Sequence, residues 1–165
     1  MNPFWTYFWP IAAAGLLAGI IAGTMGFRRH SLNKALAVGA LISVVVALIW
    51  HGPLGASDRF SSTVERISRQ TLVEWEMPRI SAHLHRGPLS RQLVLAGTAD
   101  DFQRSELARI MSNVPGVGTA DWTDRLGGLP LFAEAGVAAL LSFLVGALLA
   151  YLVELHRRHN AQWTW

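Results

Sequence analysis

Two histidines separated by one residue are the side chains best suited to metal chemistry in this sequence. His83 and His85 alternate with apolar residues, and alternation along a strand places both imidazoles on one face. Imidazole nitrogens bind zinc and other transition metals, but the sequence places no third ligand beside them. The same alternation predicts that both histidines lie on the solvated side of the strand. We therefore expect no metal ion at this pair.

The other histidines are equally poor candidates for metal or haem binding. His156 and His159 lie one helical turn apart beside Arg157 and Arg158, whose positive charge opposes metal binding, so we interpret them as interfacial residues. A haem within a membrane needs histidines deep in facing helices, and His51 lies at a helix end. We expect no cofactor.

Signals of catalysis are also missing from the sequence. The chain has no cysteine, which excludes thiol catalysis, disulfides and iron–sulfur clusters bound by cysteine. No nucleophile elbow or metal-binding motif occurs, and Gly127 and Gly128 stand before a proline and read as a hinge rather than a phosphate loop. We therefore predict that the protein is not an enzyme.

Glu134 is a single acid near the start of an otherwise apolar run. It would lie about one turn inside the membrane interface, where snorkelling or a hydrogen bond can accommodate a carboxylate. A role in proton relay or in contact with a partner is the alternative.

Small residues recur at four-residue spacing in three apolar runs, and such stripes let helix backbones approach closely. One interpretation is that the stripes pack the three helices on one another. The other is that at least one stripe docks on a partner subunit. The stripes consist of Gly15, Gly19 and Gly23; of Ala35, Gly39, Ser43 and Ala47; and of Ala138, Ser142, Gly146 and Ala150.

The elements that carry these residues begin with three predicted membrane spans. The chain of 165 residues is 52% hydrophobic, and no charged residue occurs between Phe4 and Phe27. Each run is long enough, or nearly so, to cross a hydrocarbon core of about 30 Å. The predicted segments are a first span over 1–27, a loop over 28–34, a second span over 35–54, an extramembrane domain over 58–124, a third span over 129–154 and a tail over 155–165.

Basic residues predict the orientation of the spans. Arg28, Arg29 and Lys34 follow the first span, and Arg157 and Arg158 follow the third, so the positive-inside rule places the short loop and the tail in the cytoplasm. The first ten residues contain no Lys or Arg, which is unlike the basic start of a cleaved signal peptide. The prediction is a bacterial inner-membrane protein with a periplasmic N-terminus and a cytoplasmic C-terminus.

The segment between the second and third spans predicts a small α+β domain. Apolar spacing indicates a helix over 60–77 and a second helix, capped by Thr98, Asp100 or Asp101, that ends near 113 and turns Phe102 inward. Alternation indicates strands over 79–85, 92–96 and 117–122, so the order is αββαβ. Two helices on one face of the sheet would leave the opposite face solvated.

The segment from Leu93 to Trp122 resembles the second half of a BON domain. Gly97 matches the glycine that ends a strand in that family, and Pro115, Gly116 and Val117 match its turn before the last strand. The resemblance covers residues 60–123 and is strongest over 93–122. It implies an envelope-associated module that binds phospholipid or other envelope components.

Charge and resemblance together predict a binding protein. Residues 51–128 contain nine arginines and nine acids, and such a balance argues against binding of nucleic acid. We predict a non-catalytic inner-membrane protein whose module binds phospholipid headgroups or an envelope protein. The alternative is an accessory subunit of a larger membrane complex, which docks through its small-residue helix faces.

Overall fold

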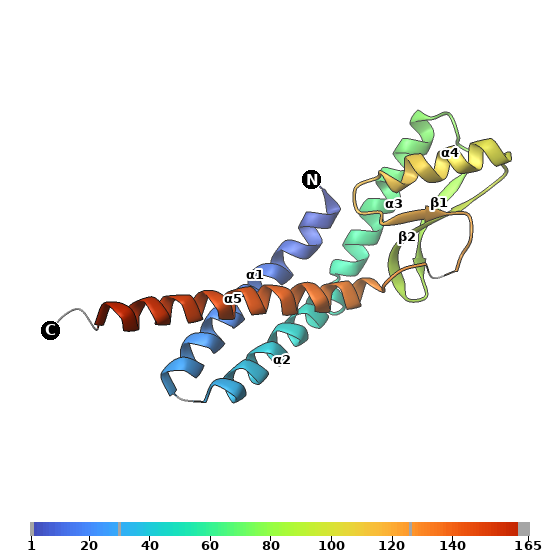
Figure 1. Ribbon diagram of the computed structural model, residues 1–165. Helices are drawn as coiled ribbons and strands as arrows, with labels where there is room; N and C mark the ends of the chain where they lie inside the picture. The colour runs from blue at the N-terminus through green and yellow to red at the C-terminus, as the bar shows by residue number, and fades with distance from the viewer. Residues whose placement is uncertain (1, 30, 126, 162–165) are drawn as a thin grey trace. The chain divides into compact units, whose positions relative to one another are not determined.

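The chain forms three long helices and a small α/β segment, which connects the second long helix to the third (Figure 1). The computed structural model describes residues 2–29, 31–125 and 127–161. The elements are α1 Pro3–Arg29, α2 Leu32–His51, α3 Ala56–Glu74, β1 Ser81–Arg86, β2 Leu89–Ala96, α4 Asp101–Ser112, β3 Thr119–Asp121 and α5 Leu131–Ala161.

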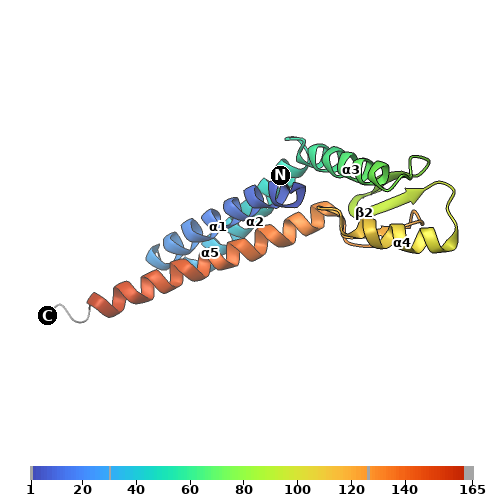
Figure 2. The same cartoon turned by 90° about the horizontal axis from the view of Figure 1, so that it is seen from above.

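These elements divide into two compact units. The first contains residues 1–7 and 55–134, and the second contains residues 8–54 and 135–165. The first turns of α1 and α5 therefore belong to the same unit as the sheet. In the second unit α1, α2 and α5 run side by side (Figures 1 and 2).

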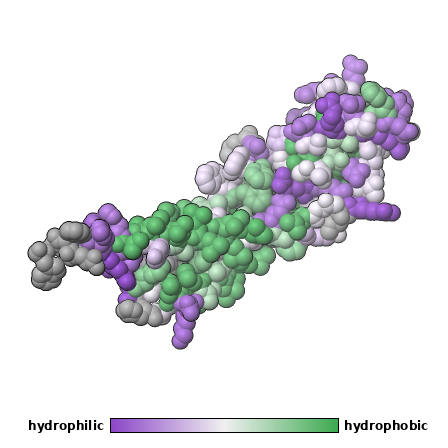
Figure 3. Space-filling view, in the orientation of Figure 1, coloured by the Kyte–Doolittle hydropathy of each residue, from purple (hydrophilic) through white to green (hydrophobic). Residues whose placement is uncertain are grey.

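Three helices are long and apolar enough to cross a membrane: Pro3–Arg28, Leu32–His51 and Leu131–Asn160. Only 17% of the most apolar window of α2 is buried within the chain, so most of its apolar side chains face outward. Figure 3 shows hydrophobic side chains gathered over the long helices, whereas the α/β unit is mostly hydrophilic on the same face. A contiguous apolar surface of this kind fits a lipid environment, as expected for a multi-pass membrane protein.

The bounds of the long helices differ from the predicted spans at their ends. α1 includes the basic residues Arg28 and Arg29, and α2 begins at Leu32 and ends at His51, earlier than predicted. α5 continues into the predicted tail and is described as far as Ala161. The apolar run defines the part of a helix that lipid can cover, but the backbone hydrogen bonds continue into polar residues beyond it.

The α/β unit contains a three-stranded sheet in the order β1-β2-β3. β1 pairs antiparallel with β2, so that Leu84 faces Leu93, and β2 pairs parallel with β3. The αββαβ order agrees with the prediction. The core of this unit is apolar and includes the buried residues Phe60, Val64, Leu72, Leu84, Leu93, Leu95, Leu107 and Met111.

α3 covers the outer edge of β1. The Glu65 carboxylate accepts a hydrogen bond from the Leu84 N–H at 3.1 Å and two from the Arg86 guanidinium, each at 3.0 Å. The Glu65 side chain thus satisfies a backbone donor of the edge strand β1 that would otherwise be open to pairing with another chain. α3 itself spans 56–74 instead of the predicted 60–77. Ala56, buried four residues before Phe60, extends its apolar face by one turn, and a left-handed residue, Glu76, follows its end.

α4 begins with a capping box. The Asp100 side chain accepts a hydrogen bond from the Gln103 N–H at 2.7 Å, and the Gln103 side chain accepts one from the Asp100 N–H at 3.2 Å. Of the three predicted caps, Asp100 is the one used. This reciprocal pair satisfies two backbone N–H groups and defines where α4 begins.

The prediction that the second face of the sheet is solvated was wrong for β2. Gln92 and Val94 are both buried. The Gln92 side chain donates to the Thr123 carbonyl at 3.2 Å and accepts from the Gly127 N–H at 2.7 Å. The segment that follows β3 therefore covers this face, and Gly127 is held against the sheet at a position that we predicted to be a hinge.

Candidate functional site

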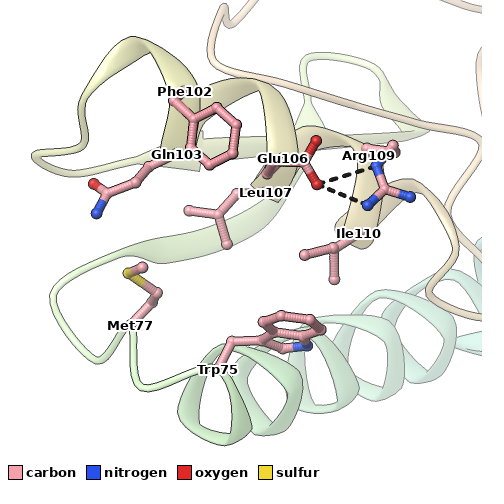
Figure 4. A pocket seen from close by; sticks show the side chains of 8 residues that line it. All are labelled: Trp75, Met77, Phe102, Gln103, Glu106, Leu107, Arg109 and Ile110. Atoms are coloured by element: carbon pink, nitrogen blue, oxygen red, sulfur yellow. Dashed lines mark hydrogen bonds and ion pairs between the residues drawn. The ribbon is translucent and has the colours of Figure 1, made fainter.

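An apolar groove lies between the end of α3 and one face of α4 (Figure 4). Its volume is about 270 Å³. Figure 4 shows the α4 side chains on one wall and Trp75 and Met77 on the other. We call this surface the Trp75 groove; its lining residues are Trp75, Met77, Phe102, Gln103, Glu106, Leu107, Arg109 and Ile110.

The end of α3 determines how Trp75 is presented. The Trp75 N–H donates to the Thr71 carbonyl and the Glu76 N–H to the Val73 carbonyl, each at 3.0 Å, which closes the helix. Glu76 itself adopts a left-handed φ of 57°. Trp75 falls within the helix predicted over 60–77 but lies just beyond the end of α3, and it is 55% exposed. A large aromatic side chain on a fixed helix end is therefore available for contact with another molecule.

The rotation of α4 about its axis determines which of its side chains form the wall opposite Trp75. Leu107 and Met111, four residues apart, are buried against the sheet. Phe102 precedes Leu107 by five residues, which places it about 140° around the helix from that core face. The prediction that Phe102 faces inward was therefore wrong, and its side chain is 75% exposed. Ile110 is half-buried and also lines the groove.

An ion pair closes one side of the groove. The Glu106 Oε2 atom accepts hydrogen bonds from the Arg109 Nη2 and Nε atoms at 2.7 and 3.2 Å. These hydrogen bonds, together with the charge of Glu106, raise the pKa of the Arg109 guanidinium above its usual value. The pair is exposed, so a charged group on a ligand can exchange with either member at little cost.

A second polar cluster centres on Arg91, which joins three segments of the α/β unit. Its Nε atom donates to the Gly116 carbonyl at 3.1 Å and its Nη2 atom to the Val117 carbonyl at 3.5 Å. Its Nη1 atom lies 3.2 Å from the Glu134 carboxylate in the first turn of α5, and its guanidinium lies 4.9 Å from the centre of the Phe4 ring.

The Arg91 cluster accommodates the carboxylate of Glu134 at the start of an apolar helix. Both members of the Arg91–Glu134 pair are about one quarter exposed, so the carboxylate is paired with a cation of the same unit rather than left to lipid. Nearby, the rings of Tyr7 and Phe60 lie 5.5 Å apart. The cluster therefore ties the first turns of α1 and α5 to the sheet and has the character of a positioning site.

The small-residue stripes of α1 and α5 face each other in the second unit. A β-carbon on Gly15 would lie 2.5 Å from the Ala139 carbonyl oxygen, and one on Gly19 would meet the Phe143 carbonyl oxygen. On the α5 side, a β-carbon on Gly146 would meet the Leu16 carbonyl oxygen. The two backbones approach so closely that any side chain at these glycines would separate them.

The remaining stripe residues complete this packing. A β-carbon on Gly39 of α2 would lie 2.6 Å from the Ala22 side chain of α1, and one on Gly23 would lie 2.7 Å from the Ala150 side chain. Ser43 and Ser142 each donate to the carbonyl four residues earlier, on Gly39 and Ala138. These stripe positions are therefore occupied by contacts within the chain.

The residues that carry the BON resemblance lie at the ends of strands. Gly97 follows β2 with a φ of 145°, and Gly116 has a φ of 100° in the turn before β3, with Pro115 and Val117 on either side of it. Positive φ values favour glycine at both positions. The turn supplies the two carbonyls that Arg91 binds, so it has a structural role in this chain.

The structure separates the predicted histidine pair. His83 is exposed, but His85 is buried, because the register of β1 shifts between Leu84 and Arg86. The prediction that both rings are solvated was therefore wrong for His85. Its Nδ1 atom lies 3.2 Å from the Pro88 carbonyl oxygen and its Nε2 atom 3.7 Å from Asp124. Among the described residues, no group of three or more His, Cys, Asp or Glu side chains is placed to hold a metal ion.

Comparisons with protein-family models, with curated proteins and with solved structures found no match to this chain. The resemblance to the BON family therefore stays a prediction that rests on the residues themselves.

Sequence reasoning missed the Trp75 groove and the Arg91 cluster. The groove was hidden because its walls come from segments about 25 residues apart, whose contact only the fold creates. One signal was present: Phe102 does not share the four-residue spacing of Leu107 and Met111, and it follows two acids at a helix start. Arg91 gave no comparable signal, because its partners are carbonyls and a distant carboxylate.

Proposed function

We propose that this protein is a non-catalytic, multi-pass protein of the bacterial inner membrane whose periplasmic module binds another envelope protein. The observation that carries the proposal is the Trp75 groove, where Trp75 and Phe102 are 55% and 75% exposed around an apolar floor. Exposed aromatic residues around a depression are typical of protein-binding surfaces, in which tryptophan, phenylalanine and methionine are enriched.

A protein partner fits this groove better than a phospholipid headgroup does. A headgroup is anionic and is attracted by exposed basic residues. The Trp75 groove contributes one arginine, Arg109, and that guanidinium is paired with Glu106. The alternative of docking through the small-residue helix faces gains no support either, because those glycines pack against neighbouring helices of the same chain.

Site-specific photo-crosslinking in living cells tests the proposal. A photoreactive phenylalanine analogue replaces Phe102 in the full chain, and the matched control carries it at Ser105, an exposed residue of the same helix outside the groove lining. We expect position 102 to yield a discrete protein adduct and position 105 to yield none. Leucine or alanine at Trp75, introduced beside the probe, should reduce the adduct.

Two outcomes would contradict the proposal. The first is a complete lack of protein adducts at position 102 in membranes that contain the folded chain. The second is equal labelling at positions 102 and 105, which would indicate random collision. Adducts of position 102 with lipid alone would instead support the headgroup alternative.

A further inference from the structure

The proposed function leaves open what kind of segment enters the Trp75 groove, and the size of the groove gives the first constraint. Pockets that enclose a small molecule usually measure about 300–1,000 Å³ and cover most of the ligand. The Trp75 groove measures about 270 Å³ and is bounded by exposed side chains. A groove of this kind suits a few apolar side chains of a larger molecule better than a whole small ligand.

The composition of the walls gives the second constraint. Trp75, Phe102, Leu107 and Ile110 provide apolar contact area, and Met77 adds a flexible thioether that can adapt to the shape of a ligand. Gln103, Glu106 and Arg109 supply the polar groups at the rim. The ligand must therefore be apolar at its centre and polar at its edges.

The charge around the groove gives the third constraint. The two segments that form its walls, residues 74–79 and 100–110, contain five acids and three arginines. Two of these arginines are engaged, since Arg104 lies 5.3 Å from the Trp122 ring and Arg109 is paired with Glu106. The acids Glu74, Glu76, Asp100 and Asp101 are all exposed. These four acids lie outside the lining, on the wall segments around it; even with the exposed Arg79 on the same segments, this rim is acidic overall.

We infer that the Trp75 groove binds a short segment of an envelope protein that carries two large apolar side chains flanked by lysine or arginine. This inference rests on the proposed function and names the chemistry of its partner. The apolar pair fills the groove beside Trp75 and Phe102, and the flanking cations face the acids of the rim. Complementary charge of this kind accelerates association and excludes partners of the wrong sign.

Other occupants fit the same observations less well. An anionic membrane surface or a second copy of this acidic rim would meet repulsion. The chain's own tail combines arginines with Trp163 and Trp165, but in the proposed topology it lies across the membrane from the groove. The groove also lies far from the first residue of α3. At 1.5 Å per residue, roughly 28 Å of helix separates Ala56, which follows α2, from Trp75.

Labelled peptides measure the inference directly on the full chain in a neutral detergent. One probe carries a Leu–Phe pair flanked by two lysines on each side, a second carries glutamates in place of the lysines, and a third carries alanines in place of the apolar pair. Fluorescence anisotropy should show the lysine-flanked probe binding at least tenfold more tightly than the other two. Its affinity should fall as salt is raised, since exposed charges are screened.

Matched variants locate the binding. Phe102→Ala should weaken the lysine-flanked probe at least tenfold, and Val73→Ala, which shortens an exposed apolar side chain outside the groove lining, should not. Glu74→Lys should weaken it at least threefold at low salt, whereas Asp58→Lys makes the same charge change at the other end of α3 and should not. Circular dichroism of each variant verifies that the fold is kept.

The inference is overturned if the glutamate-flanked probe binds as tightly as the lysine-flanked one, or if Phe102→Ala has no effect on either. These results remain distinct from a failure of the proposed function. A protein adduct at position 102 whose mapped segment lacks basic residues would leave the proposed function standing and remove the inference. The absence of any adduct would remove both.

Discussion

Arg91 shows how one side chain joins β2 to the first turns of α1 and α5. Its guanidinium has five N–H donors, and it meets two carbonyls, one carboxylate and one aromatic ring. Since the side chain is about 25% exposed, water can replace few of these interactions. Loss of Arg91 would remove this partner from the Glu134 carboxylate and the Gly116 carbonyl, where little water can replace it.

We expect Arg91→Ala to destabilise the protein by about 2–3 kcal/mol, because unpaired buried polar groups cost that much. For a chain of this size the thermal midpoint in dodecyl maltoside should fall by about 5–10 °C. Arg86→Ala is the matched control: it also removes an arginine paired with a carboxylate, but Arg86 is 64% exposed. That pair should contribute at most about 1 kcal/mol. Equal shifts in the two variants would show that the Arg91 cluster stabilises nothing beyond a surface ion pair.

At the scale of the elements, α1 and α5 approach each other closely. Glycines contribute to this contact from both sides, and their absent side chains let carbonyls of one helix lie against the backbone of the other. Apolar side chains in lipid are already out of water, so their burial between helices gains no hydrophobic free energy. Helix association therefore depends on such close packing. Tolerance of a larger side chain therefore differs sharply between glycines of the same helix pair.

We expect Gly19→Leu to disrupt the α1–α5 contact at a cost of about 1–3 kcal/mol, as overpacking of a tight interface does. Gly136→Leu is the control, because a β-carbon there would have no described atom within 4 Å. Titration with SDS from dodecyl maltoside micelles measures both. The midpoint should fall for Gly19→Leu and should stay the same or rise for Gly136→Leu. Identical midpoints would contradict the assignment of Gly19 to this contact.

The elements themselves could largely be predicted from the sequence, since they depend on local periodicity. The three apolar helices and the αββαβ order follow from the spacing of apolar residues and from Pro78, Gly87 and Pro115, which interrupt them. What failed depends on contacts that spacing does not encode. His85 is buried because of a register shift in β1, and Phe102 is exposed because α4 packs on the sheet through Leu107 and Met111. The Trp75 groove results from that packing and from the point at which α3 ends.

At the scale of the whole molecule, function depends on which side of the membrane carries the α/β unit. The loop between α1 and α2 and the α/β unit are separated along the chain by α2 alone. If α2 spans the membrane, the two must lie on opposite sides. From the basic residues around the short loop, the positive-inside rule predicts that this loop lies in the cytoplasm. In that topology the Trp75 groove lies in the periplasm.

Cysteine labelling tests this topology. Because the chain contains no cysteine, each substitution to cysteine introduces a single thiol. Ser31 in the short loop and Ser105 in α4 are both exposed. In intact spheroplasts a membrane-impermeant maleimide should label Ser105→Cys and not Ser31→Cys, and permeabilisation should make Ser31→Cys reactive as well. The reverse pattern would place the groove in the cytoplasm and exclude an envelope protein as its partner. Labelling of both residues from one side would mean that α2 does not cross the membrane, and the wide apolar surface of that helix would then need a protein to cover it.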